Sequence, residues 1–568
     1  MNFMSNLGYA LVLVGVAALL SWPLGRAMTW VMSAELLGPR ARSFTRRFAQ
    51  PLEDQSWQAY CRSLLTFNAL MFTVGFVILV AQGWLPLNPD AKLGLEPSLA
   101  FNTAASFTTN TNLQHYSGEQ VLSDFSQTCA LMWLQFVSAA TGIAVLAAIA
   151  RALAPTGSGK RMGNFHGDVA RALVLLIPLA LLLGFTLILL GVPMTYEGPA
   201  IAHTLEGGEQ IIARGPVAAM VAIKQLGTNG GGFFGPNSTH PFENPGFASA
   251  TIELLAILVL PMASVWMFGR ITGRLRHAAI LFAVMTSLLL ATIIPALLIE
   301  TQPNPALADL AVESSVGEAG GESLGNLEGK ELRFGPAIGP MWAVVTTATS
   351  NGSVAAMHDS LDPMTGLLPL VGMWLNVTFG GVGVGMVNML LYALVAVFIA
   401  GLMVGRTPEY LGKKIEAPEI KLAALALLLH PLLILGGTAL FAASAWGADT
   451  VANPGSHGFT EILYEMSSAA ANNGSGFEGL SDNTFAWNLA TGLIMFAGRY
   501  LPILLPVAIA GFLATKRPQP ETIGTFRTDT PLFGLVLLGT IVLLGALLFL
   551  PAAVLGPIAE QLSLGVQP

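Results

Sequence analysis

The chain has 568 residues, of which 53% are hydrophobic and only 10% are charged, and its formal net charge is −7. A soluble domain is about one-quarter charged, so this composition excludes a soluble globular protein and indicates an integral membrane protein. The two cysteines, Cys61 and Cys129, are too few for a disulfide framework and are expected to be plain thiols.

Ten apolar runs are long enough to cross a bilayer, which takes about 20 residues in a helix. Transmembrane β-strands are only about half as long, so the runs fit helices and not a barrel. The sequence therefore predicts an all-α polytopic membrane protein with ten transmembrane helices. The runs are 7–24, 64–82, 128–150, 172–190, 248–268, 278–298, 368–404, 421–444, 486–512 and 532–552.

The distribution of charge gives the orientation of the chain. The first run has no basic residue before it and Arg26 after it, so we expect a retained anchor with its N-terminus outside, not a cleavable signal. In that orientation the cytoplasmic segments hold 20 of the 26 Lys and Arg, in agreement with the positive-inside rule. They are Arg26, Arg40, Arg42, Arg46, Arg47, Arg62, Arg151, Lys160, Arg161, Arg171, Arg270, Arg274, Arg276, Arg406, Lys413, Lys414, Lys421, Lys516, Arg517 and Arg527.

The outward segments hold 22 of the 33 Asp and Glu. An acidic outer face would concentrate cations there. The alternative is that outer loops simply avoid Lys and Arg, and composition does not decide between the two.

A short polar motif recurs four times, once in each outward segment between an inward-running and an outward-running helix. The intervals between successive motifs are 119, 122 and 122 residues. One such match would be noise, but four evenly spaced matches indicate an internal repeat. The motifs are Thr109-Asn110-Thr111-Asn112, Thr228-Asn229-Gly230-Gly231, Ser350-Asn351-Gly352-Ser353 and Asn472-Asn473-Gly474-Ser475.

Each motif follows a moderately apolar run that is too short to span the membrane. These runs begin at Ser98, Val217, Pro340 and Thr460 and are about 10–12 residues long, which suits re-entrant half-helices. Non-helical backbone at membrane depth persists only inside protein or beside a wet cavity. We therefore predict four pseudo-symmetric membrane-pore-membrane repeats around one pore.

The repeats divide the chain into six parts. An N-terminal peripheral helix with its cytoplasmic loop and a C-terminal peripheral helix flank four pore units. The predicted bounds are 1–60, 61–155, 165–270, 275–405, 418–515 and 528–568.

The backbone carbonyls of the four motifs are suited to bind a cation. Glycine adopts positive φ at little cost, so successive carbonyls can face one side, and a ring of four segments can replace the water shell of an ion. The C-terminal ends of half-helices add partial negative charge at the same point. Turns and caps favour the same residue types, but the fourfold recurrence favours a site for a dehydrated monovalent cation.

Four longer strings resemble a known family. GTNGGGFFGPNSTHPFENP (227–245), TNTNLQHYSGE (109–119), MHDS (357–360) and GRTPEYLGKKIE (405–416) are similar to the A subunit of the potassium-transporting ATPase, the channel-like component of the bacterial Kdp complex. The resemblance covers essentially the whole chain. It implies the fold of the superfamily of K⁺ transporters, K⁺ as the transported ion and a location in the bacterial inner membrane.

The resemblance also implies partners. The B subunit, a P-type ATPase, would hydrolyse ATP and receive K⁺ from this chain through a tunnel, beside a small C subunit and a short F subunit. The chain itself has no GxxxxGK[ST] loop and no DKTG string, and its inward loops are too short for a nucleotide-binding domain. We therefore expect a non-catalytic component that binds neither nucleotide nor nucleic acid.

The resemblance places the K⁺ filter on the four motifs. In the first unit Thr111 stands where the others have glycine, and a β-branched residue is strained at positive φ. That unit is expected to present its oxygens differently, with help from Asn112 and Gln114, although Gln114 is also explained as an ordinary loop residue. Asn237 is expected as further support. The filter residues are Thr109, Asn110, Thr111, Asn112, Thr228, Asn229, Gly230, Ser350, Asn351, Gly352, Asn472, Asn473 and Gly474.

Two features are expected below the filter. The run 368–404 is 37 residues long, more than a hydrocarbon core of about 30 Å accommodates, so it must be interrupted. The predicted break is at Gly380, Gly381, Gly383 and Gly385, as a broken helix that obstructs the pore; close helix packing through small residues is the alternative.

Arg499 is the second feature, at a depth where an unpaired Arg costs at least about 2.5 kcal/mol. We expect its cation in the pore below the filter, opposing K⁺ leakage. The alternative is that Arg499 only ties down the carbonyl ends of half-helices.

Other candidates are weaker. Glu253 lies near the outer end of its run and is either an ion ligand or a solvated carboxylate. The outward histidines lack metal-ligand spacing and are expected to be structural; they are His115, His203, His240, His358 and His457.

There are three alternative functions. A stand-alone K⁺ channel or cation symporter of the same superfamily would share the filter. An intramembrane enzyme would need paired catalytic groups at membrane depth, but the runs hold essentially Arg499, Glu253 and His430 and no such pair, which argues against an enzyme. A non-conducting scaffold would tolerate filter substitutions.

Overall fold

The computed structural model describes residues 3–33, 54–155, 162–302, 325–403, 405, 407–517 and 526–564. The predicted inward residues Arg40, Arg42, Arg46, Arg47, Lys160, Arg161 and Arg406 lie outside this described part.

Ten helical segments of the described part are long and apolar enough to cross a membrane, so the all-α polytopic fold predicted from the sequence is confirmed. Their large exposed side chains are mostly Leu, Val, Phe and Trp, as expected of helices that contact lipid. The segments are α1 (Phe3–Met32), α3 (Trp57–Ala81) with η2 (Gln82–Trp84), η3 (Ser126–Met132) with α6 (Trp133–Leu153), α7 (Phe165–Leu189), α9 (Phe247–Ile271), α10 (Leu275–Glu300), α14 (Val384–Met403), α15 (Ala417–Ala442), α18 (Phe485–Ala514), and α19 (Pro531–Ala553) with η7 (Val554–Ile558) and α20 (Ala559–Leu564).

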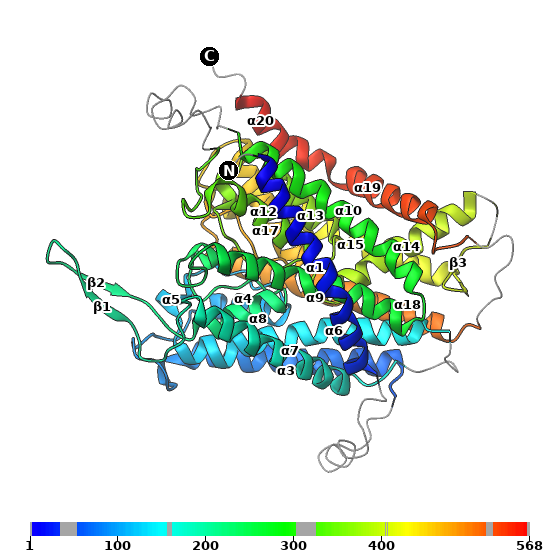
Figure 1. The fold of residues 1–568 in the computed structure, drawn as a ribbon, viewed down its shortest axis with the longest axis horizontal. Helices are drawn as coiled ribbons and strands as arrows, with labels where there is room; N and C mark the ends of the chain where they lie inside the picture. The colour runs from blue at the N-terminus through cyan, green and yellow to red at the C-terminus, as the bar shows by residue number, and fades with distance from the viewer. Residues whose placement is uncertain are drawn as a thin grey trace, which may run out of the picture.

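Helices α3, α6 and α7 run along the long axis of the molecule, α10 and α19 are oblique to it, and α1 crosses them steeply (Figure 1). A hairpin of β1 (Ala200–His203) and β2 (Glu209–Ile212) projects at one end, and β3 (Glu409–Tyr410) pairs with β4 (Lys413–Lys414) at the other. We call these the β1 end and the β3 end. Helices α6 and α9 are mostly buried, whereas less than one-third of α1, α3, α15 and α19 is buried, so α6 and α9 form the centre of the bundle.

Four half-helices enter this bundle. They are α4 (Pro97–Thr108), α8 (Val217–Leu226), α12 (Gly335–Ala348) and α17 (Ser456–Ala471). All four were expected, although α12 and α17 begin several residues before the predicted starts because Gly335, Pro336 and Ser456 continue the helices toward their N-termini. Short pieces complete the chain: α5 (Gly118–Val121), η4 (Asn237–Thr239), η6 (His358–Ser360) and α16 (Ala445–Ala448).

The seventh apolar run is interrupted, as its length predicts. It forms α13 (Pro363–Leu375) and α14, with a non-helical loop over residues 376–383 between them. The loop starts at Asn376, which has φ 47, and contains Gly380 and Gly383 with φ 55 and 82. The expectation for Gly385 is wrong, since this residue lies in the first turn of α14. A glycine is tolerated in a first turn, where few backbone groups have helical partners.

Candidate functional site

Each half-helix ends in the same backbone turn. Two residues with positive φ flank one residue with ordinary φ, so three consecutive carbonyls change direction together. The flanking pairs, with their φ values, are Asn110 (64) and Asn112 (57), Thr228 (49) and Gly230 (86), Ser350 (52) and Gly352 (95), and Asn472 (52) and Gly474 (104).

This geometry corrects the alignment of the first unit. Thr111 was expected at the position of the glycines, but Asn112 holds that position, and Asn110 corresponds to Thr228. Asparagine is one of the few residues other than glycine that tolerates the left-handed region, because its short side chain can hydrogen-bond locally. The first unit therefore keeps the shared turn without a glycine and without a strained threonine.

The four turns meet at one place. A Cβ atom added to Gly230 would lie 2.0 Å from the carbonyl oxygen of Asn351, and one added to Gly352 would lie 2.0 Å from that of Asn473. The same atom on Gly474 would lie 2.0 Å from the carbonyl oxygen of Thr111. Gly231 closes the circle, since its added Cβ would lie 2.8 Å from Cβ of Asn112.

Side-chain amides join each turn to the next. Asn229 donates to Oδ1 of Asn110 at 2.6 Å, and Asn351 donates to the carbonyl of Lys224 at 3.1 Å. Asn473 donates to the carbonyl of Thr346 at 3.0 Å. Asn472 donates to Oγ1 of Thr111 at 2.9 Å, which joins the fourth unit to the first. These amides brace the ring, so they act as supports for its main chain.

The main-chain oxygens of the ring are largely without partners. The peptides of Thr111, Asn229, Asn351 and Asn473 are fully buried, and no donor of the described residues meets their carbonyl oxygens. Buried carbonyls normally find a partner, because leaving one unpaired is unfavourable. A ring of such oxygens has the chemistry to hold a dehydrated cation.

Gln114 and Asn237 both support the second unit. Gln114 donates to the carbonyl of Gly232 at 3.1 Å and accepts from its N–H at 2.8 Å. Asn237 donates to the carbonyl of Gly230 at 2.6 Å. Gln114 was expected to assist its own unit, so this contact is a correction: the side chain reaches across to the neighbouring glycine segment.

The loop of residues 376–383 lies against the first residues of the second and third turns, Thr228 and Ser350. Val382 donates its N–H to Oγ1 of Thr228 at 2.8 Å. A Cβ on Gly381 would lie 3.7 Å from Cβ of Ser350 and 3.9 Å from Nη1 of Arg499. A Cβ on Gly383 would lie 2.3 Å from the carbonyl oxygen of Gly142, so α6 approaches this loop as closely as glycine allows.

Arg499 of α18 lies at this same junction. It is buried, donates to the carbonyl oxygen of Ser138 at 3.2 Å, and pairs with no carboxylate of the described residues. Ser138 belongs to the spanning helix α6 and not to the end of a half-helix. The guanidinium therefore adds an uncompensated positive charge beside the loop.

The remaining candidates are engaged elsewhere. Glu253 is fully buried and accepts hydrogen bonds from Gln225 at 2.7 Å and Ser238 at 3.0 Å, away from the ring carbonyls. His457 bridges Asp359 at 2.9 Å and Glu560 at 2.7 Å. Burial alone would lower its pKa, but these two hydrogen bonds outweigh burial and raise the pKa of His457 to about 10.

His115 and His457 each lie beside two carboxylates, yet in both cases the two ring nitrogens already contact protein groups. His115 contacts Asn488 at 2.7 Å and Glu465 at 3.1 Å. The ring nitrogens of His115 and His457 therefore form hydrogen bonds that join separate segments of the chain.

One pair of residues beside the ring was not predicted from the sequence. Lys224 of α8 is fully buried and forms an ion pair with the equally buried Glu243. A lysine inside an apolar half-helix was the available signal, since the other three half-helices contain no Lys or Arg.

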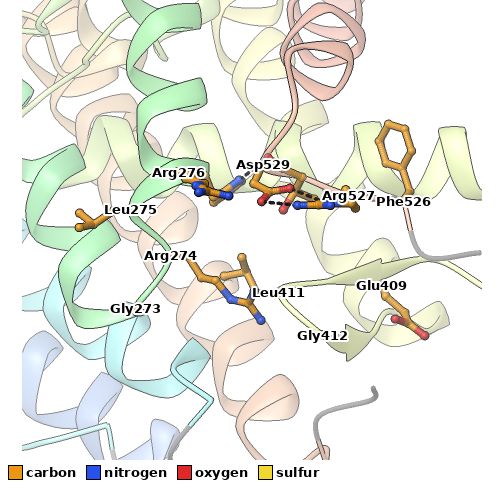
Figure 2. A pocket seen from close by; sticks show the side chains of 12 residues that line it. Gly273, Arg274, Leu275, Arg276, Glu409, Leu411, Gly412, Phe526, Arg527 and Asp529 are labelled. Carbon is orange, nitrogen blue, oxygen red and sulfur yellow. Dashed lines mark hydrogen bonds and ion pairs between the residues drawn. The ribbon is translucent and has the colours of Figure 1, made fainter. Parts of the chain in front are cut away.

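A separate cavity of about 340 Å³ opens at the β3 end (Figure 2). It lies between the start of α10, the β3–β4 hairpin and the segment before α19, and its wall includes Arg274, Arg276 and Arg527. Arg527 pairs with Asp529 at 3.0 Å. None of the ring residues lines this cavity, so it is distinct from the ring.

Comparison with known proteins gives a family and a fold. The family model described as "Potassium-transporting ATPase A subunit" matches residues 11–562. Among solved structures, the potassium transporter TrkH from Vibrio parahaemolyticus is similar over 88% of this chain and 96% of its own, with a TM-score of 0.51 and 12% identity. At that identity the likeness concerns the fold alone.

Proposed function

The chain belongs to the family of potassium-transporting ATPase A subunits. On that premise we propose that its four turns form a filter which binds and selects extracellular K⁺ and hands it to a partner P-type ATPase for ATP-driven uptake. The observation that carries the proposal is a closed ring that contains the buried carbonyl oxygens of Thr111, Asn229, Asn351 and Asn473, which meet no donor of the described residues. Such oxygens can replace the hydration shell of a monovalent cation.

The ring is assembled from the proposed pore units 61–155, 165–270, 275–405 and 418–515, which each contribute one half-helix and one turn. The C-terminal end of every half-helix carries a partial negative charge, and four such ends at one point favour a cation there. The asparagine braces between neighbouring turns support a fixed spacing of oxygens, which selection among alkali cations requires.

We propose that the loop 376–383 and Arg499 obstruct the cytoplasmic side of this filter. The loop contacts Thr228, Ser350 and α6, and the guanidinium of Arg499 lies beside it. Coulomb repulsion between this charge and K⁺ opposes direct passage, so the ion would have to leave sideways. We propose that it passes to the P-type ATPase partner, the B subunit, in a complex that includes the small C subunit and the short F subunit, while this chain binds no nucleotide.

We expect the co-purified complex to hydrolyse ATP in response to K⁺. This chain alone in liposomes should give no more K⁺ flux than vesicles without protein. The measurements are K⁺-stimulated phosphate release and a fluorescent K⁺-flux assay. The complex with an inactivated ATPase partner is the control. Sustained K⁺ flux through the isolated chain would favour the alternative, a stand-alone channel or cation symporter.

The proposed orientation in the inner membrane, with the N-terminus outside, has its own test. In a Cys61→Ser/Cys129→Ser background, the variant Leu205→Cys at the exposed tip of the β1–β2 hairpin should react with a membrane-impermeant maleimide in intact cells. The variant Lys414→Cys at the β3 end should react only after permeabilisation. The opposite pattern would reverse the proposed orientation.

A further inference from the structure

The buried ion pair of Lys224 and Glu243 stands directly behind the second turn. Both side chains are fully buried. The ammonium of Lys224 also donates to Oδ1 of Asn237 at 2.6 Å, and Glu243 accepts from the N–H of Phe234 at 3.0 Å. Two charges without solvent are unfavourable unless their geometry and hydrogen bonds are good, so a pair in this place calls for an explanation.

The equivalent position in the other units is occupied by small hydroxyl residues. Lys224 lies six residues before Gly230, and the residues six before Asn112, Gly352 and Gly474 are Ser106, Thr346 and Ser468. Thr346 and Ser468 accept a hydrogen bond directly from the N–H of their own glycine, at 2.8 and 2.9 Å. The second unit has exchanged this short link for a long cationic side chain.

The cation acts on the filter through Asn237. An ammonium can only donate hydrogen bonds, so its contact fixes Oδ1 of Asn237 on the side of Lys224. The amide nitrogen of Asn237 must then face the other way, where it donates to the carbonyl of Gly230 at 2.6 Å. The chain of contacts is therefore Glu243, Lys224, Asn237 and the carbonyl of Gly230.

This contact makes the second unit differ from the others. The carbonyl oxygens of Asn112, Gly352 and Gly474 meet no donor of the described residues, whereas that of Gly230 is held by the protein. A carbonyl that already accepts a hydrogen bond is a weaker and less mobile ligand for an ion. Of the four carbonyl oxygens at the last residue of each turn, three thus meet no donor of the described residues and one, that of Gly230, is restrained.

We infer that Lys224 and Glu243 are positioning residues which orient Asn237, restrain the carbonyl of Gly230 and thereby tune discrimination among alkali cations. The inference rests on the filter proposed above. It assigns the pair a role in selectivity that is separable from its role in packing.

The test uses the complete complex with the double variant Lys224→Thr/Glu243→Gln, which gives the second unit the hydroxyl of the third and removes both charges. The apparent affinities for K⁺ and Rb⁺ are read from the ion dependence of ATP hydrolysis. In this variant Oδ1 of Asn237 keeps only the N–H of Ser238 as a donor, at 2.8 Å, so the amide holds the carbonyl of Gly230 less firmly. The preference for K⁺ over Rb⁺ should therefore change by about tenfold. The variant Asn237→Ala, which keeps the ion pair, should change it in the same sense.

A matched control exists in the same chain. Lys330 and Glu300 form another fully buried pair, at 2.8 Å, with no contact to the four turns. The variant Lys330→Thr/Glu300→Gln removes the same charges and should leave the K⁺ to Rb⁺ ratio unchanged. An equal shift in both double variants would make the effect one of general packing and overturn the inference.

An unchanged ratio in the assembled Lys224→Thr/Glu243→Gln and Asn237→Ala complexes would also overturn it. The variant Gly352→Ala, which crowds the ring itself, distinguishes a failure of the positioning role from a failure of the filter assignment. If that variant shifts the ratio and the other two do not, only the positioning role fails. If Gly352→Ala leaves the ratio unchanged as well, the filter assignment fails.

Discussion

Replacing Gly352 by alanine is expected to weaken the apparent K⁺ affinity of the assembled complex by roughly 10- to 100-fold and to reduce its discrimination against Na⁺ and Rb⁺. Gly352 has φ 95, which strains any residue with a side chain, and the added methyl would lie 2.0 Å from the carbonyl oxygen of Asn473. The ring must open to accept it, so its oxygens lose their spacing. The measurement is ATP hydrolysis as a function of K⁺, Na⁺ and Rb⁺.

The control for this substitution is Gly455→Ala. Gly455 has φ 79 just before α17, so alanine there meets a similar backbone strain, but nothing lies within 4 Å of the added Cβ. We expect a complex of lower stability with unchanged ion affinity. If Gly352→Ala also left affinity and discrimination intact in an assembled complex, the ring would not be the filter, and a non-conducting scaffold would become the better description.

Replacing Arg499 by alanine is expected to raise passive K⁺ leakage through the complex at least tenfold, with less K⁺ transported per ATP. Two unit charges about 4 Å apart repel by about 4 kcal/mol at an effective dielectric constant of 20, which is enough to oppose straight passage. Arg499 is buried beside Gly381 and pairs with no carboxylate of the described residues, so its positive charge remains available to repel K⁺. Leakage is measured in proteoliposomes without ATP, and coupling with ATP present.

The variant Arg499→Lys keeps a positive charge and should keep leakage low, which separates the charge from the shape of the side chain. Unchanged leakage together with unchanged ATP-driven transport in Arg499→Ala would contradict a gating role. The contact with Ser138 would then be the reason for the residue, as a link between α18 and α6.

The large features of the fold were predictable because they depend on apolar length. Ten spans, four half-helices and the break in the seventh run all follow from comparing runs of apolar residues with the thickness of a bilayer. The β1–β2 hairpin escaped prediction because two strands of four residues in a polar loop leave little periodic signal.

The details of the candidate site were less predictable because residue type does not fix φ. Matching hydroxyl to hydroxyl aligned Thr109 with Thr228, whereas the backbone aligns Asn110 with it. The contact of Gln114 with Gly232 joins different units and has no sequence spacing to reveal it. The pairing of Lys224 was not predictable because its partner Glu243 lies in a loop nineteen residues away, and only the folded chain brings the two charges together.

All four turns belong to one polypeptide, and this has an evolutionary consequence. In a channel built from four identical chains, any mutation in the filter appears four times and preserves rotational symmetry. Here each quadrant carries its own sequence, so a lysine can enter one quadrant and a glycine can become asparagine in another. Such a covalently fused ring can evolve a preferred side, as the proposed lateral delivery of K⁺ to a partner subunit would require.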